Sequence, residues 1–196
     1  MTAEDDDGGA STRVAPGRSC GACTLCCKLP RVEAVDKPAG VWCRHCKPGK
    51  GCTIYATRPD PCRKFFCAWM TMPGLGDEWK PLHSKLVVAV HGPGGSRMTV
   101  HVDPQRPDAW RAEPYYTNFR RWARLEGMTI LVTVGKRYYT ILPDRDVDLG
   151  ILGDDEMILL EERKMPFGTE ITPIRVRKDD PRAQAFLAQE RSLQEK

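Results

Sequence analysis

Nine cysteines crowd into one short stretch of the chain, and clustered thiolates of this kind bind metal ions. The chain has 196 residues, and every cysteine lies between positions 20 and 67. A single cysteine usually packs as a small apolar side chain, but nine within 48 consecutive residues are not explained as core packing. The candidate metal ligands are therefore Cys20, Cys23, Cys26, Cys27, Cys43, Cys46, Cys52, Cys62 and Cys67.

The spacing of four of these cysteines matches a zinc site. Cys23 and Cys26 form one Cys-x2-Cys pair, and a second pair of the same form follows after sixteen residues. Each such turn aims two sulfurs at one point, and two turns complete a tetrahedron with Zn–S distances of ~2.3 Å. The other five cysteines would form a second centre with one thiol spare, or the nine divide differently, so spacing leaves their grouping open.

Disulfides and a ferredoxin cluster are weaker explanations of the same cysteines. Their number is odd, and residues 1–19 show no export signal, so we expect a cytoplasmic protein whose thiols stay reduced. The run that begins at Cys20 continues directly from Cys26 to Cys27, whereas bacterial ferredoxins continue with x3-Cys-Pro. Zinc, iron and an iron–sulfur cluster of another type all stay open.

Residues 20–70 resemble the CxxCxxCC family, also called YkgJ-like. The stretches that carry the resemblance are CGACTLCC at residues 20–27, GCTIY at residues 51–55 and RPDPCRKFFCAW at residues 58–69. The resemblance implies a zinc- or iron-chelating domain. Flagellin lysine N-methylases contain a related cysteine motif, which implies an alternative function as an iron–sulfur enzyme or redox accessory.

One short helix is predicted among the cysteines. Asp60 and Pro61 are typical of an N-cap and a first helical residue, and the helix is expected to continue through Met70. This arrangement would place Cys62 at the positive end of the helix. Positive charge near a thiol, from Arg63 for example, favours the thiolate that a metal requires.

The composition divides the chain into three parts. Residues 1–19 are acidic and polar without apolar periodicity, which predicts a disordered tail. Residues 20–82 form a cysteine-rich module, which needs a metal staple because so small a core is marginal, and which ends in a Gly- and Pro-rich loop over residues 71–83. Residues 83–196 form a domain of unassigned role that we expect to fold without metal.

The third part shows strand and helix signals in a mixed order. Strands are predicted at residues 85–90 and 98–102 around a GPGG turn, and at 128–134, 137–142, 157–162 and 170–177. A helix is expected to open at Glu113 and Pro114 and to end at Gly127, and a last helix to begin at Asp180. This order predicts an α+β fold with a mainly antiparallel sheet.

Several functional classes are disfavoured. The usual nucleotide, protease and hydrolase motifs are absent from the sequence, which favours a binding protein over an enzyme. The net charge of +4 does not favour nucleic-acid binding, and no apolar run is long enough to span a membrane. The sequence thus predicts a metal-binding protein that coordinates zinc or iron. A second alternative is an adaptor in which structural zinc shapes a surface for a protein partner.

Overall fold

A five-stranded sheet is the centre of the fold, in a computed structural model that describes residues 14–125, 127–166 and 168–194. The strands lie side by side in chain order, and only β4 and β5 run parallel, so the predicted α+β class with a mainly antiparallel sheet is confirmed. The strands are β3 (Leu86–His91), β4 (Arg97–Val102), β5 (Thr129–Val134), β6 (Arg137–Ile141) and β7 (Asp146–Ile151).

The connections explain this topology. The GPGG turn joins β3 and β4 as an antiparallel hairpin, as predicted, and Gly92 and Gly94 in it have positive φ. From β4 the chain crosses over through η6 (Ala109–Arg111) and α4 (Tyr115–Trp122), so β5 returns parallel to β4. The predicted helix end at Gly127 is wrong, because α4 ends five residues earlier and Gly127, at φ 71°, lies in the turn before β5.

The main core lies on one face of the sheet. Alternate residues of β3 to β6 point into it, and Trp110 and Phe119 are almost fully buried there. Trp79 contributes to the same core, with its ring 5.0 Å from Tyr115 and 5.3 Å from Trp122. The prediction of a loop over residues 71–83 is therefore wrong in part. This stretch contains η4 (Asp77–Trp79) and α3 (Pro81–Ser84), two short turns that place Trp79 against α4.

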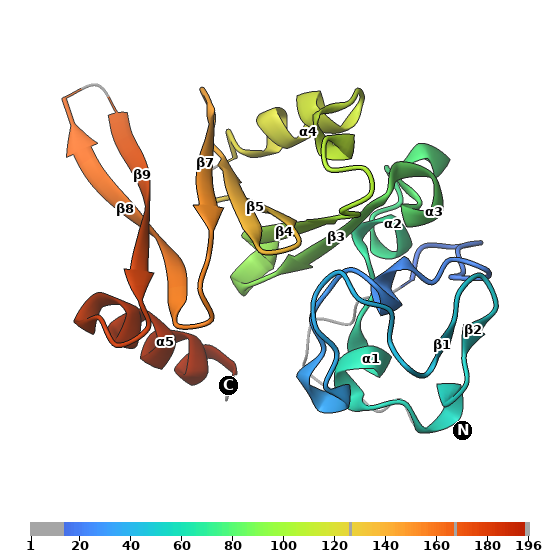
Figure 1. Ribbon diagram of the computed structural model, residues 1–196. Helices are drawn as coiled ribbons and strands as arrows, with labels where there is room; N and C mark the ends of the chain where they lie inside the picture. The colour runs from blue at the N-terminus through green and yellow to red at the C-terminus, as the bar shows by residue number, and fades with distance from the viewer. Residues whose placement is uncertain (1–13, 126, 167, 195–196) are drawn as a thin grey trace, which may run out of the picture.

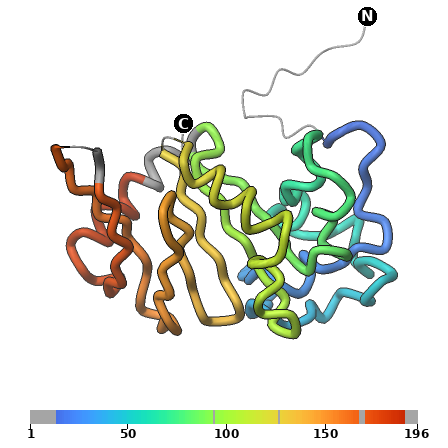
Figure 2. Tube along the Cα trace, turned by 90° about the horizontal axis from the view of Figure 1, so that it is seen from above, coloured from blue at the N-terminus to red at the C-terminus, as the bar shows by residue number. Residues whose placement is uncertain are grey.

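A hairpin and a helix lie beyond β7, at the opposite end of the molecule from the cysteines (Figures 1 and 2). The predicted strands at residues 157–162 and 170–177 are present and longer, and the last helix starts where expected. Strand β7 was not predicted. These elements are β8 (Glu156–Met165), β9 (Gly168–Arg177) and α5 (Pro181–Gln194).

The cysteine-rich segment consists of short turns and a small hairpin. The single helix predicted through Met70 is wrong, because the chain is extended at Phe65. This break lets Phe65 pack beside Leu25 while Trp69 and Met70 enter the main core. The elements are η1 (Leu25–Cys27), η2 (Glu33–Val35), β1 (Cys46–Lys47), β2 (Gly51–Cys52), η3 (Tyr55–Thr57), α1 (Asp60–Lys64) and α2 (Ala68–Thr71).

Packing contacts cross the predicted boundary between residues 82 and 83. The main core takes in α2 and Trp79 from one side and the sheet from the other. On the second face of the sheet, the buried Val87 packs against Leu25 and Leu29. The cysteine-rich segment is thus attached to both faces of the sheet near β3 (Figure 1).

Residues 1–13, most of the predicted tail, lie outside the described residues, but Ala15 and Arg18 in the rest of it contact the protein. Ala15 is buried, and its amide donates a hydrogen bond to the carbonyl of Met70 at 2.8 Å. Within the described part of the chain, no helix has the length and apolar character that crossing a membrane requires.

Candidate metal centre

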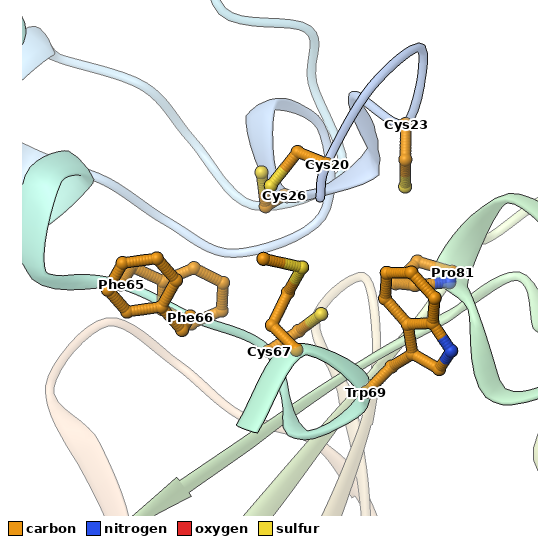
Figure 3. A pocket seen from close by; sticks show the side chains of 9 residues that line it. Cys20, Cys23, Cys26, Phe65, Phe66, Cys67, Trp69 and Pro81 are labelled. Carbon is orange, nitrogen blue, oxygen red and sulfur yellow. The ribbon is translucent and has the colours of Figure 1, made fainter. Parts of the chain in front are cut away.

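Four cysteines line one small pocket, although they come from two segments of the chain that lie far apart in sequence. The pocket has a volume of about 30 Å³ and is closed by aromatic and apolar side chains. Figure 3 shows three of the cysteines on the loop above the pocket and one below it, at the start of α2. We name these four the pocket group: Cys20, Cys23, Cys26 and Cys67.

Local backbone hydrogen bonds place the pocket group. The amide of Cys23 donates to the carbonyl of Cys20 at 2.8 Å, which closes the first turn. The η1 turn follows directly and ends in Cys26 and Cys27. Cys67 enters from the opposite side because α2 begins at the next residue and anchors Trp69 in the main core. Two independent anchors thus bring thiols to a shared pocket.

The remaining five cysteines are linked to one another by backbone pairing and by electrostatic contact. The amide of Cys43 donates to the carbonyl of Cys27 at 2.8 Å, and Cys46 lies directly opposite Cys52 in the β1–β2 pair. Cys62, from α1, interacts electrostatically with Cys27, Cys43 and Cys52. We name these five the hairpin group: Cys27, Cys43, Cys46, Cys52 and Cys62.

This division separates the two Cys-x2-Cys pairs. Cys23 and Cys26 line the pocket, whereas Cys43 and Cys46 belong to the hairpin group. Spacing alone left the grouping open, and the fold shows the reason. The chain between the pairs is tied back by a hydrogen bond from the amide of Gly40 to the carbonyl of Leu29 at 3.0 Å, and the second pair then starts beside Cys27, whose carbonyl accepts the Cys43 amide.

Burial and crowding raise the pKa of several of these thiols. Partial burial, together with neighbouring cysteines, raises the pKa of Cys20, Cys62 and Cys67 above the ordinary thiol value. The thiol of Cys26 donates a hydrogen bond to Cys27, which lowers the pKa of Cys27 and raises that of Cys26. A bound cation would replace these protons and remove the repulsion between thiolates.

A buried lysine supplies fixed positive charge beside the hairpin group. The Lys37 ammonium donates hydrogen bonds to the carbonyls of Lys28 at 2.8 Å and Pro38 at 3.1 Å, and also to that of Pro30. Its charge interacts with the thiols of both Cys43 and Cys27, among others. Burial lowers the pKa of Lys37. Lys37 therefore holds the loop after η1 in place and favours thiolates next to it.

Arg18 fixes the segment that leads into Cys20. Its guanidinium donates hydrogen bonds to the carbonyls of Met72 at 2.8 Å and Pro73 at 3.0 Å, and to those of Trp69 and Leu75. It also stacks on the Trp69 ring, 5.1 Å from the ring centroid. Trp69 lines the pocket, so Arg18 ties the backbone beside Cys20 to the pocket wall.

Arg18→Gln is expected to lower the free energy of unfolding by about 1–3 kcal/mol, because several carbonyls at the end of α2 lose their donors. The thiol of Cys20 should also react several-fold faster with an alkylating reagent, measured by peptide mass spectrometry. Arg31→Gln is the matched control, because Arg31 is exposed and forms an exposed ion pair with Glu33 at 3.5 Å. Equal behaviour of the two variants would exclude the anchoring role.

The thiols lie near one another but do not form a complete coordination sphere among the described residues. Among the described residues, no group of three or more His, Cys, Asp or Glu side chains stands in the arrangement of a metal-binding group. The donors fit a thiophilic ion by chemistry, because they are soft thiols beside an apolar wall. A metal would have to draw the sulfurs together. Arg18 and Lys37 were not found as site residues from the sequence, since nothing local marks contacts made across 50 residues or inside a loop.

Comparisons of the chain with models of protein families, with curated proteins and with solved structures found no match. The resemblance to the CxxCxxCC family therefore stays a prediction.

Proposed function

We propose that this protein binds zinc or iron through its clustered cysteine thiolates. The main support for the proposal is the lack of a hydrophobic core in one stretch of the chain. From Pro38 to Cys67 no side chain is fully buried. Trp42 and Tyr55, which would be natural core residues, are exposed. Five of the nine cysteines lie in this stretch.

Such a stretch cannot order itself by apolar burial. Fixing the backbone costs about 1–2 kcal/mol per residue, and hydrophobic burial is the usual compensation. The stretch instead has short turns and a hairpin with two residues in each strand, in which Cys46 lies opposite Cys52. A metal ion that joins four thiolates supplies the missing cross-link, with an apparent binding free energy of about 10–16 kcal/mol for structural zinc.

The environment of the thiols supports the same proposal. The pocket group faces an apolar wall that includes Phe65, Phe66 and Trp69. Lys37 and Arg58 place positive charge near Cys27, which offsets the excess negative charge of several thiolates around one dication. We further propose that the protein works in the cytoplasm, where its thiols stay reduced.

Anaerobic purification followed by elemental analysis and visible absorption spectroscopy tests the proposal. We expect elemental analysis to find zinc or iron, in a protein with little visible colour if the ion is zinc or iron(II). A brown protein with inorganic sulfide would favour the alternative of an iron–sulfur enzyme or redox accessory. A well-folded protein that contains no metal, takes up neither zinc nor iron and has nine free thiols would overturn the proposal.

A further inference from the structure

We propose that the nine cysteines form two separate metal centres, one in the pocket group and one in the hairpin group, each for a thiophilic ion such as zinc or iron(II). This inference rests on the proposed metal binding and specifies its sites. It differs from a single centre spread over the whole segment, because the fold supplies each group with its own backbone anchors.

The boundary between the two centres runs between two adjacent residues. Cys26 lines the pocket with Cys20 and Cys67, whereas Cys27 does not line it. The carbonyl of Cys27 instead accepts a hydrogen bond from the amide of Cys43. The thiol of Cys27 forms a hydrogen bond with the thiol of Cys46. Successive side chains at the end of η1 thus serve different groups.

The pocket group has the donors for a complete site. It offers four thiols, which is the number that a tetrahedral structural site requires. Its volume of about 30 Å³ leaves room for a single ion between them. The opposing anchors, the Cys20–Cys23 turn and α2, meet at this pocket, so one ion would join the start of the segment to its end.

The hairpin group also has enough donors, and it has a separate support. Four of its five thiols would fill a tetrahedron, and they come from the end of η1, the β1–β2 pair and α1. The Thr24 hydroxyl forms a hydrogen bond with the Cys46 thiol. It also accepts a hydrogen bond from the amide of Gly49 at 3.1 Å. Lys37 lies next to this group and reduces its net negative charge.

The two groups adjoin, because the thiol of Cys26 donates a hydrogen bond to the thiol of Cys27. Arg58 interacts electrostatically with Cys20 of the pocket group and with Cys27 and Cys62 of the hairpin group. A cation between two thiolate centres lowers their mutual repulsion. Two adjacent dianionic centres would otherwise disfavour one another, so this arginine makes double occupancy easier.

An anaerobic Co²⁺ titration of metal-free protein counts the centres, because cobalt in a tetrathiolate site has intense sulfur-to-metal absorption. We expect saturation at about two Co²⁺ per chain for the unaltered protein. Cys23→Ser should remove the pocket centre and leave about one. The hairpin group has one thiol to spare, so the pair Cys46→Ser and Cys52→Ser, which leaves three thiols, should do the same to the hairpin centre. The combination of all three substitutions should lose both.

The controls separate this inference from the proposed function. Near-ultraviolet circular dichroism of the aromatic core around Trp79 reports folding, and Cys43→Ser with Cys62→Ser replaces the Cys46→Ser and Cys52→Ser pair if the latter unfolds. Saturation of the unaltered chain at about one Co²⁺, with both variants weakening the same absorption, would overturn the two centres while leaving metal binding intact. Absence of any cobalt, zinc or iron binding would overturn the proposed function itself.

Discussion

Asp103→Ala is expected to lower the free energy of unfolding by about 3–5 kcal/mol, measured by chemical denaturation. The Asp103 carboxylate lies 2.8 Å from the ammonium of Lys28, and the two side chains are only 7% and 10% exposed. Lys28 directly follows the cysteines of η1, and Asp103 directly follows β4. Loss of the carboxylate would leave a buried charge without its partner at the junction between the cysteine-rich segment and the sheet.

Two controls identify the cause of this loss. Asp108→Ala removes an exposed carboxylate five residues away and is expected to change stability by less than ~0.5 kcal/mol. The double variant Lys28→Met with Asp103→Leu should recover much of the loss, because an apolar pair leaves no unpaired charge. A loss below about 1 kcal/mol for Asp103→Ala would show that the ion pair does not hold the segment to the sheet.

Removal of the metal is expected to abolish amide hydrogen-exchange protection across residues 38–64 while the sheet stays protected. This stretch has no fully buried side chain, so without thiolate cross-links nothing offsets its chain entropy. Protection there should fall on the order of a thousandfold after treatment with a strong chelator. Strands β3, β5 and β6, whose side chains form the main core, should change little.

The amides of α2 report where the stretch that we expect to depend on the metal ends. Its residues Trp69 and Met70 belong to the main core, so we expect their amides to keep protection although Cys67 lies next to them. Loss of protection in α2 and in the sheet together would mean that metal and sheet form one cooperative unit. Unchanged protection everywhere would mean that the metal has no structural role.

Much of the fold is predictable because local signals act within a few residues. The hairpin of β3 and β4 follows from a glycine turn between two β-rich runs, and α5 follows from Asp180 and Pro181. Strand β7 was not predicted because aspartates such as Asp146 and Asp148 are more typical of turns than of strands. Those carboxylates are instead bound to Arg111 at 2.8 Å and to Arg137.

The candidate site is predictable in composition but not in arrangement. Clustering and spacing identify all nine cysteines, yet the grouping depends on contacts between distant parts of the chain. Cys67 reaches the pocket only because the chain breaks at Phe65 and restarts in α2. The break is set by tertiary packing against Leu25 and Val87, which overrides the helix signal at Asp60 and Pro61.

X-ray absorption spectroscopy at the metal edge of the anaerobically purified protein reports the atoms bound to the ion, and so tests whether the cysteines bind it. We expect a first shell of about four sulfurs, at ~2.3 Å if the ion is zinc. A first shell of oxygen and nitrogen without sulfur would contradict it, because the cysteines would then not be the ligands.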